Sequence, residues 1–157
     1  MSLFVRAAIF LIIAPGLVLG WIPYWILARN PHAVASPVVR AVAFVPMAVG
    51  AACLLWCFRD FVVRGRGTPA PYDPPKKLVT TGLYRFVRNP MYIALVTVLI
   101  GEALFFGARS LWIYAGFAWL AFHLRVLLFE EPRLRELFGA EYDAYRAAVP
   151  RWIPRFP

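Results

Sequence analysis

Residues 78–92 read LVTTGLYRFVRNPMY, a polar stretch between apolar segments of the chain. Thr80 and Thr81 favour the start of a short helix, because their hydroxyl groups can accept backbone N–H groups at a helix N-terminus. Tyr84 and Arg88 are four residues apart and are predicted to share one face of that helix. This stretch is the first of two polar regions around which the apolar segments are arranged.

The end of the same stretch marks the start of an apolar helix. Asn89 is a favoured N-cap, and Pro90 suits the first helical turn. An aromatic ring, guanidinium groups and a helix N-terminus are therefore expected together at one membrane surface. Such an arrangement attracts carboxylate or phosphate groups.

The second polar region is Glu130-Glu131-Pro132, which follows the apolar run AGFAWLAFHLRVLLF at 115–129. Proline disfavours helical backbone at the preceding residue, so the helix is predicted to end here. Two carboxylates at the base of a membrane helix are costly unless they meet a cation. They either fasten helices by ion pairs or serve a functional site, and the pattern leaves both open. The arginines considered as partners are Arg85, Arg88 and Arg125.

The composition is that of a polytopic membrane protein. The chain has 157 residues, of which 62% are hydrophobic and 17% aromatic, and its mean hydropathy is +0.66. The formal charge of +9 lies mainly in the connections between apolar spans, as the positive-inside rule expects. Nucleic-acid binding is therefore not expected, and anionic membrane lipid accounts for the charge.

The chain is predicted to be an all-α integral membrane protein with about four transmembrane helices and a C-terminal amphipathic cytoplasmic helix. One domain covers 1–157, with an N-terminal helical hairpin at 1–58. The first span is read as a retained anchor rather than a signal peptide. The expected spans are 3–27, 38–58, 91–106 and 111–129.

The connection at 59–77 is rich in Arg and Lys, which predicts that this side and both termini are cytoplasmic. Its proline-rich part, 68–75, is expected to be an extended linker or a cover over the site. Beyond Pro132, apolar residues recur at helical spacing with charged residues between them, which predicts an amphipathic helix bent at Gly139. Trp152 in the tail is expected to anchor it at the membrane interface.

A metal site is not expected. Cys53 and Cys57 lie one turn apart in an apolar helix, where a disulfide would be poorly placed and packing is the ordinary role. No histidine or further cysteine completes a ligand set. His123 and Arg125 are functional candidates because ionisable residues within membrane helices are costly to keep, although Arg125 can also neutralise a glutamate.

The ordered set GLYRFVRNPMY, a helical hairpin, and EEPRLRELFGAEYDAYRAAVPRWIP resembles the isoprenylcysteine carboxyl methyltransferase and phospholipid methyltransferase superfamily over 78–154. The resemblance implies an integral-membrane enzyme that transfers the methyl group of S-adenosyl-L-methionine to a lipid-like or small hydrophobic acceptor. It places the donor on the cytoplasmic side, between the 78–92 segment, the last membrane helix and the C-terminal helix. The acceptor would enter from the bilayer.

The resemblance also implies site residues. Glu131 is assigned to the positive end of the donor, and Arg88 or Arg125 to an anionic group of donor or acceptor. Many relatives have His where this chain has Asn89, and Asn cannot act as a base. The implied catalytic residues are Arg88, Glu131 and Arg125. The implied donor-binding residues are Leu78, Val79, Gly82, Tyr84, Asn89, Pro90, Tyr92, Glu130 and Glu131.

Two other functions compete with methyl transfer. Sterol reductases have a comparable membrane core, so an NADPH-dependent reductase is one alternative. A non-catalytic four-span scaffold, in which the arginine and glutamate residues only fix packing, is the other. The acceptor itself stays open between a carboxylate, an amine and a thiol. Compactness and richness in Ala and Arg indicate a bacterial inner membrane.

Overall fold

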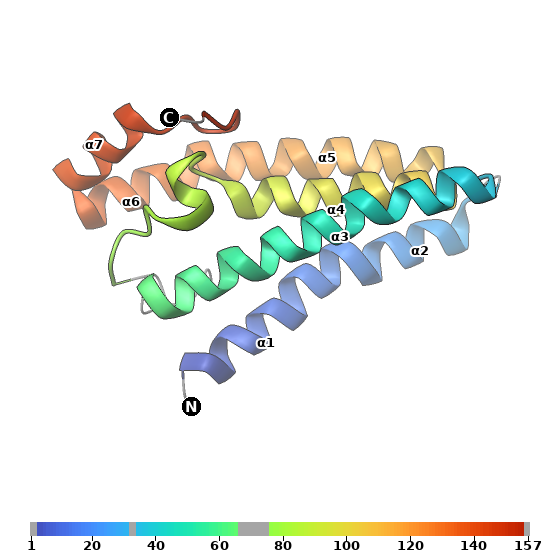
Figure 1. The fold of residues 1–157 in the computed structure, drawn as a ribbon, viewed down its shortest axis with the longest axis horizontal. Coiled ribbons are helices and arrows are strands. Elements are labelled where there is room, and N and C mark those ends of the chain that lie inside the picture. Colours follow the sequence, from blue (N-terminus) through green and yellow to red (C-terminus); the bar gives the residue numbers. More distant parts are fainter. Residues whose placement is uncertain (1–2, 32–33, 66–75, 156–157) are drawn as a thin grey trace.

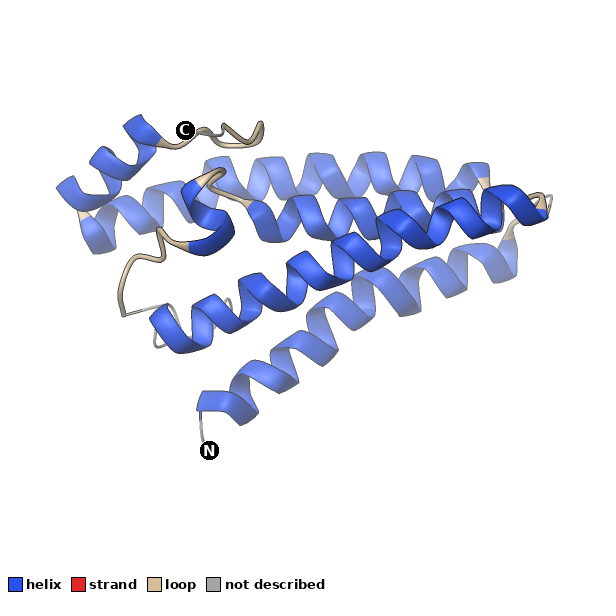
Figure 2. Cartoon of the chain, in the orientation of Figure 1, coloured by secondary structure: helices blue, strands red, loops and turns tan. Residues whose placement is uncertain are grey.

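The computed structural model of the chain describes residues 3–31, 34–65 and 76–155. Within these residues the backbone forms helices and loops and contains no strand, which confirms the predicted all-α class (Figure 2). Three helical stretches are long and apolar enough to cross a membrane, and a fourth apolar helix is shorter. The predicted proline-rich linker at 68–75 lies outside the described residues.

The first candidate span, Ala8–Arg29, runs through α1 (Leu3–Gly16), a π-helical turn at Leu17–Trp21 and α2 (Ile22–Arg29). Pro23 lacks an N–H group for the helical ladder, and the wide turn directly before α2 accommodates that loss. Apolar side chains on this helix are widely exposed, among them Ile12 at 72%. Such a surface suits contact with lipid.

The second span is α3 (Pro37–Asp60), which continues as a π-helical turn at Phe61–Gly65. Ser36 caps its start by accepting the N–H of Val39 at 3.4 Å. α3 packs closely on α4 (Pro90–Phe106), because Gly50 and Gly101 leave room for the facing backbone. A Cβ atom at Gly50 would lie 2.7 Å from the carbonyl oxygen of Ala94.

The third long span corrects the predicted helix end. α5 (Arg109–Arg125), a π-helical turn at Val126–Glu130 and α6 (Glu131–Phe138) form one candidate span, Arg109–Phe138. Glu131 is helical, with φ −63° and ψ −44°. The proline at 132 sits in the first turn of α6, directly after the π-helical turn, so the helix continues where we expected it to stop.

The short helix predicted near Thr80 is also different. Only Gly82–Arg85 is helical, as a single 3-10 turn, and Thr81 makes no side-chain cap. Tyr84 and Arg88 therefore do not share a helix face, because the helix ends before Arg88. The predicted break at Gly139 is confirmed: its φ is +52°, and it separates α6 from α7 (Ala140–Ala148).

The helices place both polar regions at one end of the bundle. In Figure 1 the 3-10 turn, α6 and α7 gather at the left, where both chain ends also lie. The end of α2, the start of α3 and the turn between α4 and α5 lie at the opposite end. The α4–α5 turn uses Gly107 with φ +63°, a left-handed conformation that glycine adopts easily.

Candidate functional site

Glu131 lies at the centre of a buried charge cluster. Its Oε1 atom is 3.0 Å from Nη1 of Arg88 and 2.7 Å from Nε of Arg151, and its Oε2 accepts from Nη2 of Arg151 at 3.0 Å. The side chains of Glu131 and Arg88 are only 9% and 10% exposed. Burial is tolerable here because the carboxylate meets two cations. Two guanidinium groups and one carboxylate leave a net charge of +1.

Glu130 has different partners. Its Oε1 atom accepts a hydrogen bond from the Tyr92 hydroxyl group and another from Nε of Arg125 at 2.8 Å. Arg125 also donates to the Tyr92 oxygen at 3.1 Å, and the Tyr92 ring stacks on Phe122 with centroids 4.7 Å apart. The two consecutive glutamates therefore pair with three arginines, Arg88 and Arg151 at Glu131 and Arg125 at Glu130, and this second cluster is neutral overall.

The two clusters join the polar regions that the sequence separates. Arg88 and Tyr92 come from the 78–92 segment, whereas Glu130 and Glu131 come from the last membrane helix. Arg88 has one unused donor: within the described part of the chain, its buried Nε atom has no hydrogen-bond partner, whereas its Nη1 atom is in the ion pair with Glu131. A buried guanidinium with an unused donor is suited to an anionic group of a ligand.

Of the two residues predicted to start α4, Pro90 behaves as expected and Asn89 does not. Pro90 occupies the first turn and is buried, as predicted. The Asn89 side chain makes no cap and instead donates from Nδ2 to the carbonyl oxygen of Arg151 at 3.2 Å. The cap prediction was wrong because the chain end, which local sequence cannot place, offers this amide a carbonyl partner.

Residues 149–155, which we call the C-terminal strap, lie across the start of α4. The Arg88 N–H donates to the Pro150 carbonyl at 2.9 Å, and the Arg155 N–H donates to the Phe86 carbonyl at 3.0 Å. Trp152 donates from Nε1 to Nδ1 of His123 at 3.0 Å. The strap thus ties the 86–89 segment to α5. Trp152, which was predicted to anchor the tail at the membrane interface, here attaches it to His123 of α5.

Gly82 is required by its backbone and by its neighbour. Its φ is +64°, and a Cβ atom there would collide with the carboxylate of Asp60 and lie 3.2 Å from Nε1 of Trp56. Asp60 is fully buried at the end of α3, with Arg64 at 3.5 Å and Arg59 at 3.7 Å. Sequence reasoning counted Asp60 only as one charge of a basic loop.

The side chains of Val79 and Tyr84 face the protein core. They pack with Cys57 in one buried cluster, and Leu78 beside them is half-buried. The Tyr84 ring meets Phe61 edge to face at 5.5 Å. Burial raises the pKa of Tyr84 well above its usual value, so its phenol stays protonated at neutral pH. Any ligand contact of Val79 would use its backbone.

Two tyrosines of α7 support this segment from the other side. The Tyr145 hydroxyl group donates to the Tyr84 carbonyl at 2.6 Å, and Tyr142, which is 2% exposed, lies against Arg88. Burial raises the pKa of both phenols, so both remain neutral hydrogen-bonding groups at physiological pH. Their apolar periodicity was visible in the sequence, but it predicted only that they faced inward.

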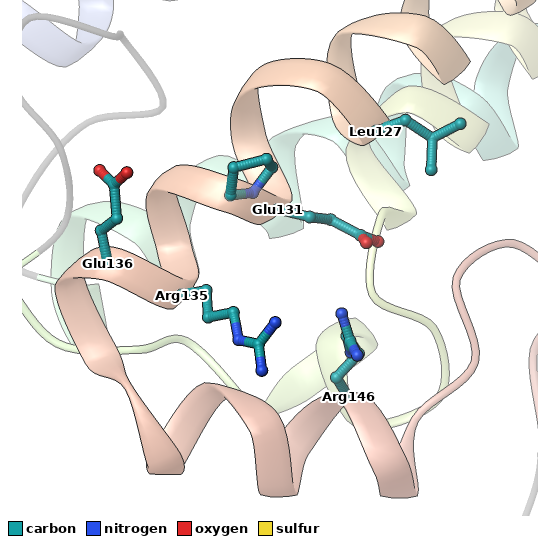
Figure 3. A pocket seen from close by; sticks show the side chains of 6 residues that line it. Leu127, Glu131, Arg135, Glu136 and Arg146 are labelled. Carbon is teal, nitrogen blue, oxygen red and sulfur yellow. The ribbon is translucent and has the colours of Figure 1, made fainter.

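A pocket with a volume of about 430 Å³ lies between α6 and α7, next to Glu131. In Figure 3 Glu131, Arg135 and Arg146 point into this space, whereas Glu136 points away. Arg135 is held by Asp143 at 3.2 Å. Arg146 makes no ion pair with any residue in the described ranges. The lining residues are Leu127, Glu131, Pro132, Arg135, Glu136 and Arg146.

No group of three or more His, Cys, Asp and Glu side chains suitable for a metal occurs among residues 3–31, 34–65 and 76–155. The ion pairs at this end join arginine to glutamate or aspartate. Among the described residues, no hydrogen bond or ion pair joins Leu78, Val79 or Gly82 to Glu130 or Glu131. Of the other predicted residues, Arg88 pairs with Glu131, whereas Tyr92 and Arg125 both meet Glu130.

Comparison with known proteins gives a family. A family model described as phospholipid methyltransferase matches residues 38–141, more than half of the chain. The match begins in α3 and ends in α7, so it includes Asp60 and both glutamates but not the C-terminal strap. No solved structure shows a significant match.

Three curated relatives are methyltransferases by name. The protein-S-isoprenylcysteine O-methyltransferase of Schizosaccharomyces pombe is 35% identical over 81 residues, covering 51% of this chain and 34% of that protein. The probable protein-S-isoprenylcysteine O-methyltransferase of Oryza sativa subsp. indica is 31% identical over 84 residues, covering 53% and 44%. Methanethiol S-methyltransferase 1 of Bradyrhizobium diazoefficiens is 31% identical over 87 residues, covering 51% and 27%. Each match thus spans less than half of the relative.

Proposed function

The chain belongs to the phospholipid methyltransferase family, as its motif set predicted, and we propose that it transfers the methyl group of S-adenosyl-L-methionine to a lipid-like or small hydrophobic acceptor. The observation that carries this proposal is the direct pairing of the two polar regions, Arg88 with Glu131 and Tyr92 with Glu130. These ion pairs and hydrogen bonds bring the motif residues together at one end of the bundle. The methyltransferase names of the relatives support the same reaction class.

The residues at this end fit the methyl donor. S-adenosylmethionine supplies an electrophilic methyl group on a sulfonium and also carries an ammonium and a carboxylate. Glu130 and Glu131 offer the negative charge for its positive end, and the unused Nε donor of Arg88 suits its carboxylate. The pocket beside Glu131, about 430 Å³, falls in the range of small-molecule sites. Backbone groups of Leu78 and Val79 would meet the adenosine part.

Methyl transfer requires little acid–base catalysis by the protein. The displacement is in line, and the protein contributes by positioning both groups and excluding water. Asn89 cannot remove a proton, and its amide is already engaged with the strap. An acceptor that arrives ionised, such as a carboxylate or a thiolate, therefore suits this site best. The Arg125–Glu130–Tyr92 cluster would orient the acceptor at the membrane side.

We place the site at the cytoplasmic face of a bacterial inner membrane, with both termini on that side. Arg59, Arg64, Lys76 and Lys77 lie near the end of the bundle that carries the site, and cytoplasmic loops are enriched in such residues. The acceptor would reach Glu130 from the bilayer, where the exposed apolar helix faces give a lipid-like molecule access.

The hairpin and the motif-bearing core act as one domain in this proposal. The close packing of Gly50 on α4 crosses the boundary between them, and so does the approach of Trp56 to Gly82. The reductase alternative has no specific support in the site. The scaffold alternative can be distinguished from methyl transfer by experiment. It predicts that removing the Glu131 charge changes the stability of the protein but no binding or catalytic activity.

Transfer of a radiolabelled methyl group tests the proposal. The purified protein in lipid nanodiscs is incubated with labelled S-adenosylmethionine and a panel of prenylated thiol acids, amine phospholipids and hydrophobic thiols. We expect label in an acceptor that carries an ionisable carboxylate or thiol, and none with Glu131→Gln. The proposal would be contradicted if the folded protein binds no S-adenosylmethionine and transfers no methyl group to any of these acceptor classes.

A further inference from the structure

The Glu131 carboxylate depends on Arg151 more than on Arg88. Arg151 makes two hydrogen bonds to it, at 2.7 and 3.0 Å, and reaches both oxygens. Arg88 approaches only Oε1, and its Nη1 is not aligned for a hydrogen bond. The fork of a guanidinium group matches a carboxylate in this two-point geometry, which fixes orientation as well as charge. Oε2 has no other hydrogen-bond donor within the described chain.

Arg151 is itself held from two sides by the C-terminal strap. Its carbonyl oxygen accepts from the Asn89 amide, and the carbonyl of Pro150 before it accepts from the Arg88 N–H. Trp152 after it bonds His123 and packs on Trp119, with ring centroids 4.4 Å apart. The segment that positions the guanidinium group at Glu131 is therefore hydrogen-bonded both to the start of α4 and to α5.

We propose that Arg151 is a positioning residue for methyl-donor binding: it holds the Glu131 carboxylate in the orientation that meets the positive end of the donor. This inference rests on the proposed function. Glu131 is 8% exposed, so a carboxylate freed from Arg151 would be left with the single contact from Arg88. It would turn fully onto that arginine, because a buried charge keeps its nearest counter-ion. Arg151 thus acts through Glu131.

The charge balance makes the sign of the effect informative. With Arg151 in place the cluster of Arg88, Glu131 and Arg151 carries +1. If Arg151 merely competed with the donor for Glu131, removing it would tighten binding. If it positions the carboxylate, removing it weakens binding, by about tenfold or more given the usual strength of hydrogen bonds to charged groups.

The test is a double-mutant cycle on donor affinity, measured by calorimetry with S-adenosylmethionine on the full chain in detergent. We expect Arg151→Gln to raise Kd about tenfold or more and Arg151→Lys to restore part of the loss, since Lys keeps the charge without the fork. In a Glu131→Gln background, Arg151→Gln should add little, because the group through which it acts is already altered. Arg155→Gln is the matched control on the same strap, where only the backbone N–H is used.

Each outcome has one meaning. A wild-type protein that binds no donor contradicts the proposed function itself. If the wild type binds the donor and Arg151→Gln binds it equally well or more tightly, only the role of Arg151 is overturned. The same holds if Arg151→Gln weakens donor binding in the Glu131→Gln background as much as it does in the wild type. If Arg151→Gln does not fold, the same comparison is made with Arg151→Lys, for which wild-type affinity would overturn the inference.

Discussion

At the scale of single residues, Gly82 is the position least able to change. We expect Gly82→Ala to destabilise the protein by about 2 kcal/mol, because the new Cβ meets the Asp60 carboxylate and the backbone must hold a positive φ. Thermal unfolding in detergent measures this. Gly116→Ala in α5 is the control, since a Cβ there meets nothing within 4 Å and alanine favours helix. Equal melting temperatures for the two variants would contradict the packing described here.

Tyr145 gives a second test at the residue scale. Tyr145→Phe removes the hydroxyl group that donates to the Tyr84 carbonyl and leaves that carbonyl without this partner. The expected loss in unfolding free energy is about 1–2 kcal/mol. Tyr24→Phe, at an exposed tyrosine, should leave stability unchanged. A Tyr145→Phe protein as stable as the wild type would mean that this hydrogen bond contributes nothing to holding the 78–92 segment.

The sequence predicted part of the site. The cost of carboxylates at a membrane helix end suggested Arg85, Arg88 or Arg125 as partners. Arg88 and Arg125 do pair with the glutamates, whereas Arg85 lies over the Phe86 ring. Asn89 was predicted to be an N-cap because only its local sequence was considered. Its actual partner lies 62 residues further along the chain. Arg151 and Asp60 were not identified, since nothing in their local pattern distinguishes them from surface charges.

At the scale of helices, the α3–α4 interface depends on small residues. Gly50→Ala should destabilise the bundle by about 1–3 kcal/mol, because its Cβ would lie 2.7 Å from the Ala94 carbonyl oxygen and the helices would have to separate. Gly20→Ala, where a Cβ meets nothing within 4 Å, is the control. Denaturant unfolding of both variants in mixed micelles compares them. A smaller effect at Gly50 than at Gly20 would contradict the close packing.

Helix ends were harder to predict than helix spans. The four apolar stretches follow from composition and length, and the break at Gly139 follows from a residue that adopts positive φ. The continuation through Pro132 was missed because a π-helical turn accommodates the missing N–H, and no local sequence pattern announces such a turn. The 3-10 turn at Gly82–Arg85 likewise begins at a residue that lies against Asp60, a contact that local sequence does not reveal.

At the scale of the whole molecule, the site and the described chain ends share one end of the bundle (Figure 1). We expect a fluorescent protein fused after Pro157 to fluoresce in bacterial cells and an alkaline phosphatase fused there to be inactive, because the C-terminus is proposed to be cytoplasmic. A phosphatase inserted at Gly107, in the α4–α5 turn at the opposite end, should be active. The reverse pattern would place the site on the outer face.

The most direct test of the central claim is the affinity of the detergent-purified protein for S-adenosylmethionine, measured by calorimetry. The account predicts saturable binding by the wild type, at least tenfold weaker binding by Glu131→Gln, and wild-type affinity for Glu141→Gln, which is exposed on α7 and is not one of the residues that line the pocket. Equal binding by wild type and Glu131→Gln, or no binding by the folded wild type, would contradict it. Glu131 would then serve only to fasten the helices.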